Sequence, residues 1–195
     1  MTVLDRSVEF KKVLMVIARK TIKHEIPLME GFQYVSYTDS LCEPWCNLHI
    51  NTKLFTDQKQ AHEKWDRMLR QDEAFFKENF LFVTDSSGKL VGSAGLWPGT
   101  DFEEGRLRIH YVSVLEEAQH NRIAQAMISK LCMKYDQIPG KYPLYLATQS
   151  QSYGAIALYV HMGFTPYLGA YNDCSQEENE AAWEFTTQVM REKAK

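Results

Sequence analysis

RLRIHYVSVLEEAQHNRIAQAMISKLCMKY, residues 106–135, joins a strand pattern to a helix pattern through one short polar turn. Residues 106–114 alternate along the chain and are rich in β-branched and aromatic side chains, which is typical of a strand. Apolar residues then recur at every fourth position from Ile123 to Tyr135, which predicts a helix with one apolar face. The turn at 116–121 would leave free backbone N–H groups at the start of that helix, where anions bind. A β-turn-α unit without a ligand is the alternative for this stretch alone.

The composition is that of one ordinary globular domain, and we predict a single domain over residues 1–195. The chain is 45% hydrophobic and 24% charged, which argues against disorder. The net charge is −3 without a Lys/Arg-rich run, so nucleic acid is not expected as a partner, and the mild acidity suits an amine substrate. Residues 1–12 lack the apolar core of a signal peptide and no window is long and apolar enough for a membrane span, which predicts a cytoplasmic protein without a membrane partner.

The four cysteines are not predicted to bind a metal. Cys42 and Cys46 form a C-x3-C pair, but no second Cys/His pair follows at the spacing of zinc sites. Cys132 falls within the helical pattern and is expected to pack as a small apolar residue.

The rest of the chain predicts an α/β (α+β) fold with a mixed, mostly antiparallel sheet and helices on both faces. The segments 106–114 and 143–149 are joined by a helix, so these two strands should be parallel. The segment 172–180 is expected to be an acidic, mobile loop. Strands are predicted at 8–20, where a buried helix is the alternative, and at 32–38, 80–85, 90–97, 106–114, 144–148, 164–171 and 182–189. Helices are predicted within 40–51, at 56–71, from 123 to the Pro-Gly at 139–140, and at 155–162.

Two glycines in the segment 90–97 leave little side chain on that strand. Gly92 and Gly95 therefore predict either the close approach of another group to this backbone or a bulge in the strand.

Two motifs resemble those of the GNAT family of acyl-CoA N-acyltransferases. The segment VSVLEEAQHNRIA, residues 112–124, is similar to the family's V-x-V followed by a pyrophosphate loop of the form R/Q-x-x-G-x-G/A. The segment SYGAIALYVHMGF, residues 152–164, is similar to N-x-x-A-x-x-L-Y-x-x-x-G-F. Both motifs occur in the family's order, and the likeness covers residues 30–190. The resemblance implies a fold in which the parallel strands 106–114 and 143–149 splay apart.

The same resemblance implies that acetyl-CoA is the co-substrate, held without a metal. The pantetheine arm would pair with backbone groups between the splayed strands, and the pyrophosphate would lie on the N–H groups at the helix start. Arg122 stands where the family usually has Gly, and Ser152 where it often has Asn. An arginine can add a charge-assisted contact to a phosphate. The implied coenzyme-binding residues are Val112, Ser113, Val114, Gln119, His120, Asn121, Arg122, Ile123, Ala124 and Ser152.

Two residues are candidates for proton transfer. Tyr159 matches the tyrosine of the second motif, which implies a general acid toward the coenzyme sulfur; a core tyrosine on an amphipathic helix is the alternative. His110 lies two residues before Val112 on the same predicted strand face and is a possible base, since histidine titrates near neutral pH. A histidine hydrogen-bonded on the sheet is the alternative there. Trp45 and Trp97 are candidates for a substrate pocket, with a core position as the alternative.

The sequence therefore predicts an N-acetyltransferase that moves acetyl from acetyl-CoA to a primary amine, on a small molecule or a peptide, by direct attack. A non-catalytic acyl-CoA sensor or interaction module with the same fold is the second hypothesis. A transferase for longer acyl chains is the third, and it depends on the depth of the space beside Gly92 and Gly95. The oligomeric state stays open, a homodimer included.

Overall fold

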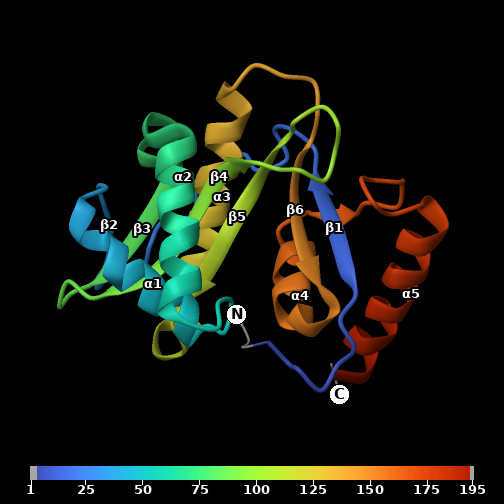
Figure 1. Ribbon diagram of the computed structural model, residues 1–195, viewed down its shortest axis with the longest axis horizontal. Helices are drawn as coiled ribbons and strands as arrows, with labels where there is room; N and C mark the ends of the chain where they lie inside the picture. The colour runs from blue at the N-terminus through green and yellow to red at the C-terminus, as the bar shows by residue number, and fades with distance from the viewer. Residues whose placement is uncertain (1–3, 194–195) are drawn as a thin grey trace.

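The computed structural model of the protein describes residues 4–193, and the two ends of the predicted 1–195 domain lie outside the described residues. One seven-stranded sheet forms its centre, with the strand order β2-β3-β4-β5-β6-β1-β7 (Figure 1). In chain order the elements are β1 (Lys12–Ile17), β2 (Phe32–Val35), α1 (Cys42–Asn51), α2 (Gln58–Asn79), β3 (Phe80–Asp85), β4 (Leu90–Pro98), β5 (Leu107–Val114), α3 (Ile123–Gln137), β6 (Leu144–Gln149), α4 (Tyr153–His161), β7 (Thr165–Pro166) and α5 (Gln176–Lys193), with short 3-10 turns at Asp39–Leu41, Glu116–Ala118 and Ser150–Ser152.

The sheet is antiparallel except at its middle, where β5 and β6 run parallel. These two strands pair only at Arg108 with Tyr145 and at Ile109 with Leu146. Beyond those two positions they diverge, as Figure 1 shows. The predicted fold class and the splayed parallel pair are therefore confirmed.

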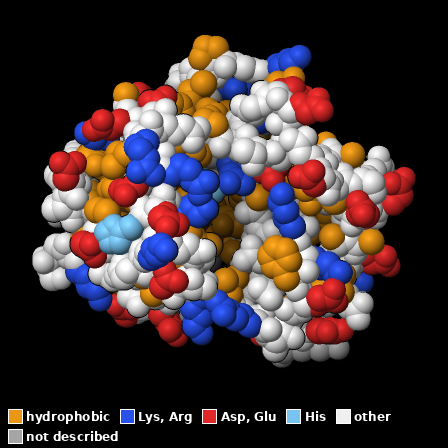
Figure 2. Space-filling view, in the orientation of Figure 1, with side chains coloured by type: hydrophobic (Ala, Val, Ile, Leu, Met, Phe, Trp, Pro, Cys, Tyr) orange, Lys and Arg blue, Asp and Glu red, His pale blue; other side chains and the backbone are white. Residues whose placement is uncertain are grey.

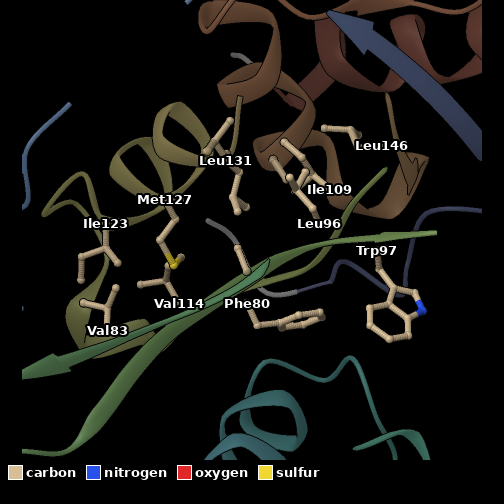
Figure 3. Close-up of a cluster of buried hydrophobic side chains, with 14 of the residues drawn as sticks. Phe80, Val83, Leu96, Trp97, Ile109, Val114, Ile123, Met127, Leu131 and Leu146 are labelled. Atoms are coloured by element: carbon tan, nitrogen blue, oxygen red, sulfur yellow. The ribbon is translucent and has the colours of Figure 1, made fainter. Parts of the chain in front are cut away.

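Helices cover both faces of the sheet. In Figure 1, α1 and α2 lie in front of β3 to β5 and α3 lies behind them, while α5 packs beside β1. Figure 3 shows Ile123, Met127 and Leu131 pointing from α3 toward the sheet, and all three are buried. Each side chain of this kind stabilises the fold by about 2 kcal/mol through loss of apolar surface from water. No helix within residues 4–193 is long and apolar enough to cross a membrane.

The helix predicted at 56–71 is confirmed, and it continues further than expected. The Asp57 carboxylate accepts a hydrogen bond from the Gln60 backbone N–H at 2.9 Å and so caps the start of α2. At Asp72 the backbone leaves the helical region, and the Asp72 carboxylate accepts from the Phe75 N–H at 2.9 Å, which caps a second helical segment. Phe76 lies in this second segment and is a fully buried core residue.

The prediction of a last strand at 182–189 is wrong, because this segment belongs to α5. The helix begins with a capping box: the Ser175 hydroxyl accepts from the Glu178 N–H at 3.2 Å, and the Glu178 carboxylate accepts from the Ser175 N–H at 2.8 Å. The acidic loop expected at 172–180 is thus largely the first turn of a helix. Its buried residues, Asn179, Trp183, Thr186 and Val189, recur at helical spacing.

The strand expected at 164–171 is shorter in the structure and comprises only Thr165–Pro166, which pairs with β1.

The two glycines of β4 are explained by packing. A Cβ on Gly92 would lie 2.9 Å from the Ile123 side chain, and a Cβ on Gly95 would lie 2.4 Å from the Phe80 ring. The space beside both glycines is therefore filled by core side chains and holds no deep acyl cavity.

Candidate active site

A cavity of about 190 Å³ lies where β5 and β6 separate. Beyond Ile109 and Leu146 the two strands do not pair, so their facing edges leave backbone N–H and C=O groups open to a ligand. Figure 2 shows a hollow near the centre of this face, with Lys and Arg side chains along its rim. Seven residues of β5 line the cavity together with the end of β6 and the first turns of α4; those predicted for the site are His110, Val112, Ser113, Val114, Gln119, Ser152 and Tyr159.

The strand β5 is irregular in the middle of the site. Between Ser113, opposite Ser93, and His110, opposite Gly95, β5 carries one more residue than β4. The extra residue makes a β-bulge in β5. Tyr111 lies in this bulge and has a left-handed backbone conformation, with φ of 51°. The regular alternation expected between His110 and Val112 is therefore interrupted, although both residues line the cavity.

Tyr159 lies on α4 and lines the inner part of the cavity. Its side chain is buried, and burial raises the pKa of its phenol above the ordinary value. Because the raised pKa keeps the phenol protonated at neutral pH, Tyr159 can donate a hydrogen bond or a proton into the cavity. Its position matches the role that the sequence motif implies, and the role itself stays a prediction.

His110 also faces the cavity from β5. Burial lowers the pKa of its imidazole well below the ordinary value, and the positive charge of Arg108 lowers it further. The imidazole is therefore neutral at pH 7, and a neutral imidazole can accept a proton or a hydrogen bond. A role as base is chemically open to His110 and stays a prediction.

The turn before α3 forms a second cavity of about 340 Å³ that shares Val114 and Gln119 with the first. His120 and Arg122 adopt left-handed backbone conformations there, with φ of 65° and 56°. Arg122 thus takes the conformation for which a glycine is favoured, and its side chain is exposed rather than folded into the turn. The predicted residues His120, Arg122, Ile123 and Ala124 line this second cavity with Gln119.

Free N–H groups point to anion binding at this turn. The first intrahelical hydrogen bond of α3 runs from the Ala126 N–H to the Arg122 carbonyl, so the N–H groups of Ile123, Ala124 and Gln125 lie before the ladder begins. Among the described residues no side chain caps them. They carry the positive end of the helix dipole into the second cavity.

Asn121 lines neither cavity and has a supporting position instead. Its side-chain amide donates to the Ala118 carbonyl at 3.2 Å and to the Gln119 carbonyl at 3.1 Å, which braces the turn. Gln119 in turn donates from its side chain to the Val114 carbonyl at 3.4 Å, at the end of β5. These hydrogen bonds brace the turn that lies between the two cavities.

His49 is a polar neighbour of the site that sequence reasoning missed. It is fully buried on α1, its Nδ1 lies 2.9 Å from the Ser113 Oγ, and that oxygen lies 3.2 Å from the Thr52 Oγ1. Burial lowers the pKa of His49 to about 3, so the ring is neutral. The Ser113 side chain therefore faces α1, and only its backbone is free for a coenzyme. No sequence signal links His49 to Ser113, because 64 residues separate them.

Neither Trp45 nor Trp97 lines the cavity, so the prediction of a substrate pocket around them is wrong. Both are core residues, at 0% and 5% exposure. Trp45 packs against His49 and Tyr111 beneath the cavity wall, with ring centroids 4.2 Å and 5.5 Å apart. The residues that do form this wall are Asn51, Thr52 and Leu54, which follow or end α1.

Three basic side chains act on the β5 side of the cavity, and one of them lines it. Arg108 lines it and forms an ion pair with the buried Asp101 at 3.1 Å, while Asp101 also pairs with Lys12 at 2.5 Å and accepts from the Tyr145 hydroxyl at 2.9 Å. The charge of Lys64 acts on His110, and that of Arg67 acts on Tyr111. Lys64 and Arg67 thus add positive charge near the β5 side of the cavity, while the charge of Arg108 is balanced in part by Asp101.

Comparisons with known proteins show which proteins this chain resembles. The family model of the GNAT acetyltransferases matches residues 44–164. A curated relative, N-acetyltransferase family 8 member 3 of Rattus norvegicus, is 28% identical over 127 residues, covering 60% of this chain and 55% of the relative. The chain thus spans about half the length of the curated relative it matches.

Solved structures share the fold at low sequence identity. A GCN5-related N-acetyltransferase from Sphaerobacter thermophilus superposes with a TM-score of 0.60 at 20% identity, over 82% of this chain and 49% of that one. A GNAT acetyltransferase from Colwellia psychrerythraea superposes with a TM-score of 0.57 at 12% identity, over 82% of this chain and 54% of that one. At these identities the likeness is one of fold.

Proposed function

Since the chain belongs to the GNAT acetyltransferase family, we propose that it transfers an acetyl group from acetyl-CoA to a primary amine. One observation carries the proposal: the unpaired edge of β5 lines the cavity that holds the Tyr159 phenol, and this cavity shares Val114 and Gln119 with the cavity at the free N–H groups of α3. The diphosphate would lie on the first turn of α3 and the pantetheine arm between β5 and β6. The thioester then ends beside Tyr159.

The proposed reaction is a direct transfer. The neutral amine nitrogen attacks the thioester carbonyl, a backbone N–H on the open edge of β5 stabilises the oxyanion, and the C–S bond breaks. The leaving thiolate takes the proton of the Tyr159 phenol, and the amine loses one proton to His110 or water. Burial raises the pKa of Tyr159, so the phenol keeps its proton until negative charge develops on the sulfur beside it.

We further propose that the acceptor amine carries a carboxylate, as an amino acid or a peptide terminus does. Arg108 lines the cavity, and the positive charges of Lys64 and Arg67 act on His110 and Tyr111 in its wall, which disfavours a polyamine. The α-amino group of a peptide has a pKa of about 7.7–8.0, against about 10.4 for lysine. More of it is therefore neutral at pH 7, and a weak base such as His110 suffices.

A matched acceptor panel tests both proposals. Acetyl transfer is followed by mass spectrometry with free amino acids, the same amino acids amidated at the carboxylate, and polyamines. We expect turnover with the free acids to exceed that with their amides by about tenfold or more. Equal or faster turnover of the amides would contradict the acceptor class alone. Coenzyme binding without turnover of any amine would instead support the sensor hypothesis.

Arg122 offers a second test, because it stands in a glycine-like conformation. Both Arg122→Gly and Arg122→Ala remove the guanidinium, but only glycine suits φ of 56° without strain. If the guanidinium contacts a phosphate, calorimetry should show both variants binding acetyl-CoA about tenfold more weakly. A tighter complex with Arg122→Gly would mean that the arginine hinders the coenzyme.

A further inference from the structure

A second cluster of polar side chains lies at the beginning of α1, at the opposite end of that helix from the cavity wall. Cys42 and Cys46 are one turn apart on α1, and His62 reaches them from α2. Their ligand atoms all lie within 4.8 Å of one another. Both sulfurs are free thiols. The sequence did not predict a metal site here because the third side chain of the cluster, His62, lies on another helix.

The separation of the ligand atoms fits a tetrahedral metal ion. The Cys42 Sγ lies 3.4 Å from the His62 Nδ1. Zinc bonds of about 2.3 Å to sulfur and about 2.0 Å to nitrogen, at a tetrahedral angle, would place such a pair about 3.5 Å apart. The three side chains therefore need only small movements to close around an ion.

The second ring nitrogen of His62 contacts a carboxylate, as the second nitrogen of a metal-binding histidine commonly does. The His62 Nε2 lies 2.8 Å from the Glu43 carboxylate. A carboxylate that accepts from one ring nitrogen leaves the lone pair on the other nitrogen, here Nδ1, free for a metal. Glu43 thus orients His62 toward the two sulfurs.

The surroundings of the cluster favour a cation. Asp66 follows His62 by one helical turn on α2, and its negative charge, like that of Glu43, acts on both thiols. The His62 side chain is 35% exposed, so an ion has a path from solvent and room for a fourth ligand. Cys46 is buried, which holds one ligand rigidly in the protein.

We propose that Cys42, Cys46 and His62 bind one zinc ion, with a fourth position open to solvent. Both cysteines bind as thiolates, so two protons leave when the ion enters. The ion links α1 to α2. Since α1 ends at the residues that form the cavity wall, the site stabilises that wall and takes no part in acetyl transfer.

Zinc binding is measurable on the full chain, kept reduced and first stripped with a chelator. We expect one zinc per chain by elemental analysis, and a Tm raised by roughly 5–10 °C at a hundredfold excess over Kd. Co²⁺ in its place should give thiolate charge-transfer absorption. Cys42→Ser and His62→Ala should lose stoichiometric zinc, and Glu43→Gln should bind about 10–100-fold more weakly. Cys132→Ser, which changes a cysteine on α3, should bind as the unaltered chain does.

The cobalt spectrum keeps the proposal testable even if a cysteine variant fails to fold, because it uses the unaltered chain. An unaltered chain that binds neither zinc nor cobalt stoichiometrically would overturn the proposal. Equal zinc binding by Cys42→Ser and by Cys132→Ser would overturn it as well.

Discussion

Tyr159→Phe should lower kcat for acetyl transfer by about tenfold or more while leaving the Kd for acetyl-CoA nearly unchanged. The phenol is buried in the cavity between β5 and β6, and its raised pKa keeps its proton in place until negative charge forms on the coenzyme sulfur. Phenylalanine keeps the ring and its packing but has no proton to give. A group that acts only in the transition state changes kcat and not ground-state binding.

Tyr153→Phe is the matched control, since Tyr153 lies on the same helix but its hydroxyl lies 3.4 Å from the Asp5 carboxylate, outside the cavity lining. That variant should retain full activity. Steady-state kinetics and calorimetry on both variants separate turnover from binding. If Tyr159→Phe turns over as fast as the unaltered chain, Tyr159 has no part in the chemistry.

Ala124→Glu should weaken acetyl-CoA binding far more than Ala124→Gln does. Ala124 lies in the first turn of α3 and lines the second cavity, where the free N–H groups would hold the diphosphate. Glutamate and glutamine are nearly equal in size, so steric effects cancel in the comparison. The remaining difference is one negative charge beside the phosphates, which we expect to raise Kd by about tenfold or more beyond the glutamine variant.

Ala124 is 7% exposed, so a carboxylate there loses hydration, while the helix dipole favours a negative charge in the first turn; the thermal melts show whether both variants keep the fold. Calorimetric titration with acetyl-CoA and thermal melts of both variants make the measurement. Equal affinities would mean that the phosphates bind elsewhere.

The centre of the fold was predictable because its signals are local. The pattern of 106–114 and the spacing of apolar residues from Ile123 to Tyr135 each lie within a single element. The strand and the helix that they predict are both confirmed, although the bulge at Tyr111 interrupts the alternation of the strand. The error at 182–189 arose because Trp183 and Val189 fit both a two-residue and a helical period. The Ser175–Glu178 capping box was the signal that favours the helix, and it lay in a segment read as a loop.

The parts of the site that escaped prediction depend on contacts between distant segments. His49 meets Ser113 only because α1 packs on β5, and Cys46 meets His62 only because α1 packs on α2. The bulge at Tyr111 has a left-handed backbone but contains no glycine, so the sequence gives no signal for it. The left-handed backbone of Arg122 could not be predicted for the same reason, because the turn imposes it and arginine does not favour it.

A crystal structure with coenzyme A bound tests the central claim most directly. We expect the diphosphate at the N–H groups of 119–125, the pantetheine arm along the open edge of β5, and the sulfur within hydrogen-bonding distance of the Tyr159 hydroxyl. Coenzyme bound outside the space between β5 and β6, or a diphosphate away from the start of α3, would contradict the claim.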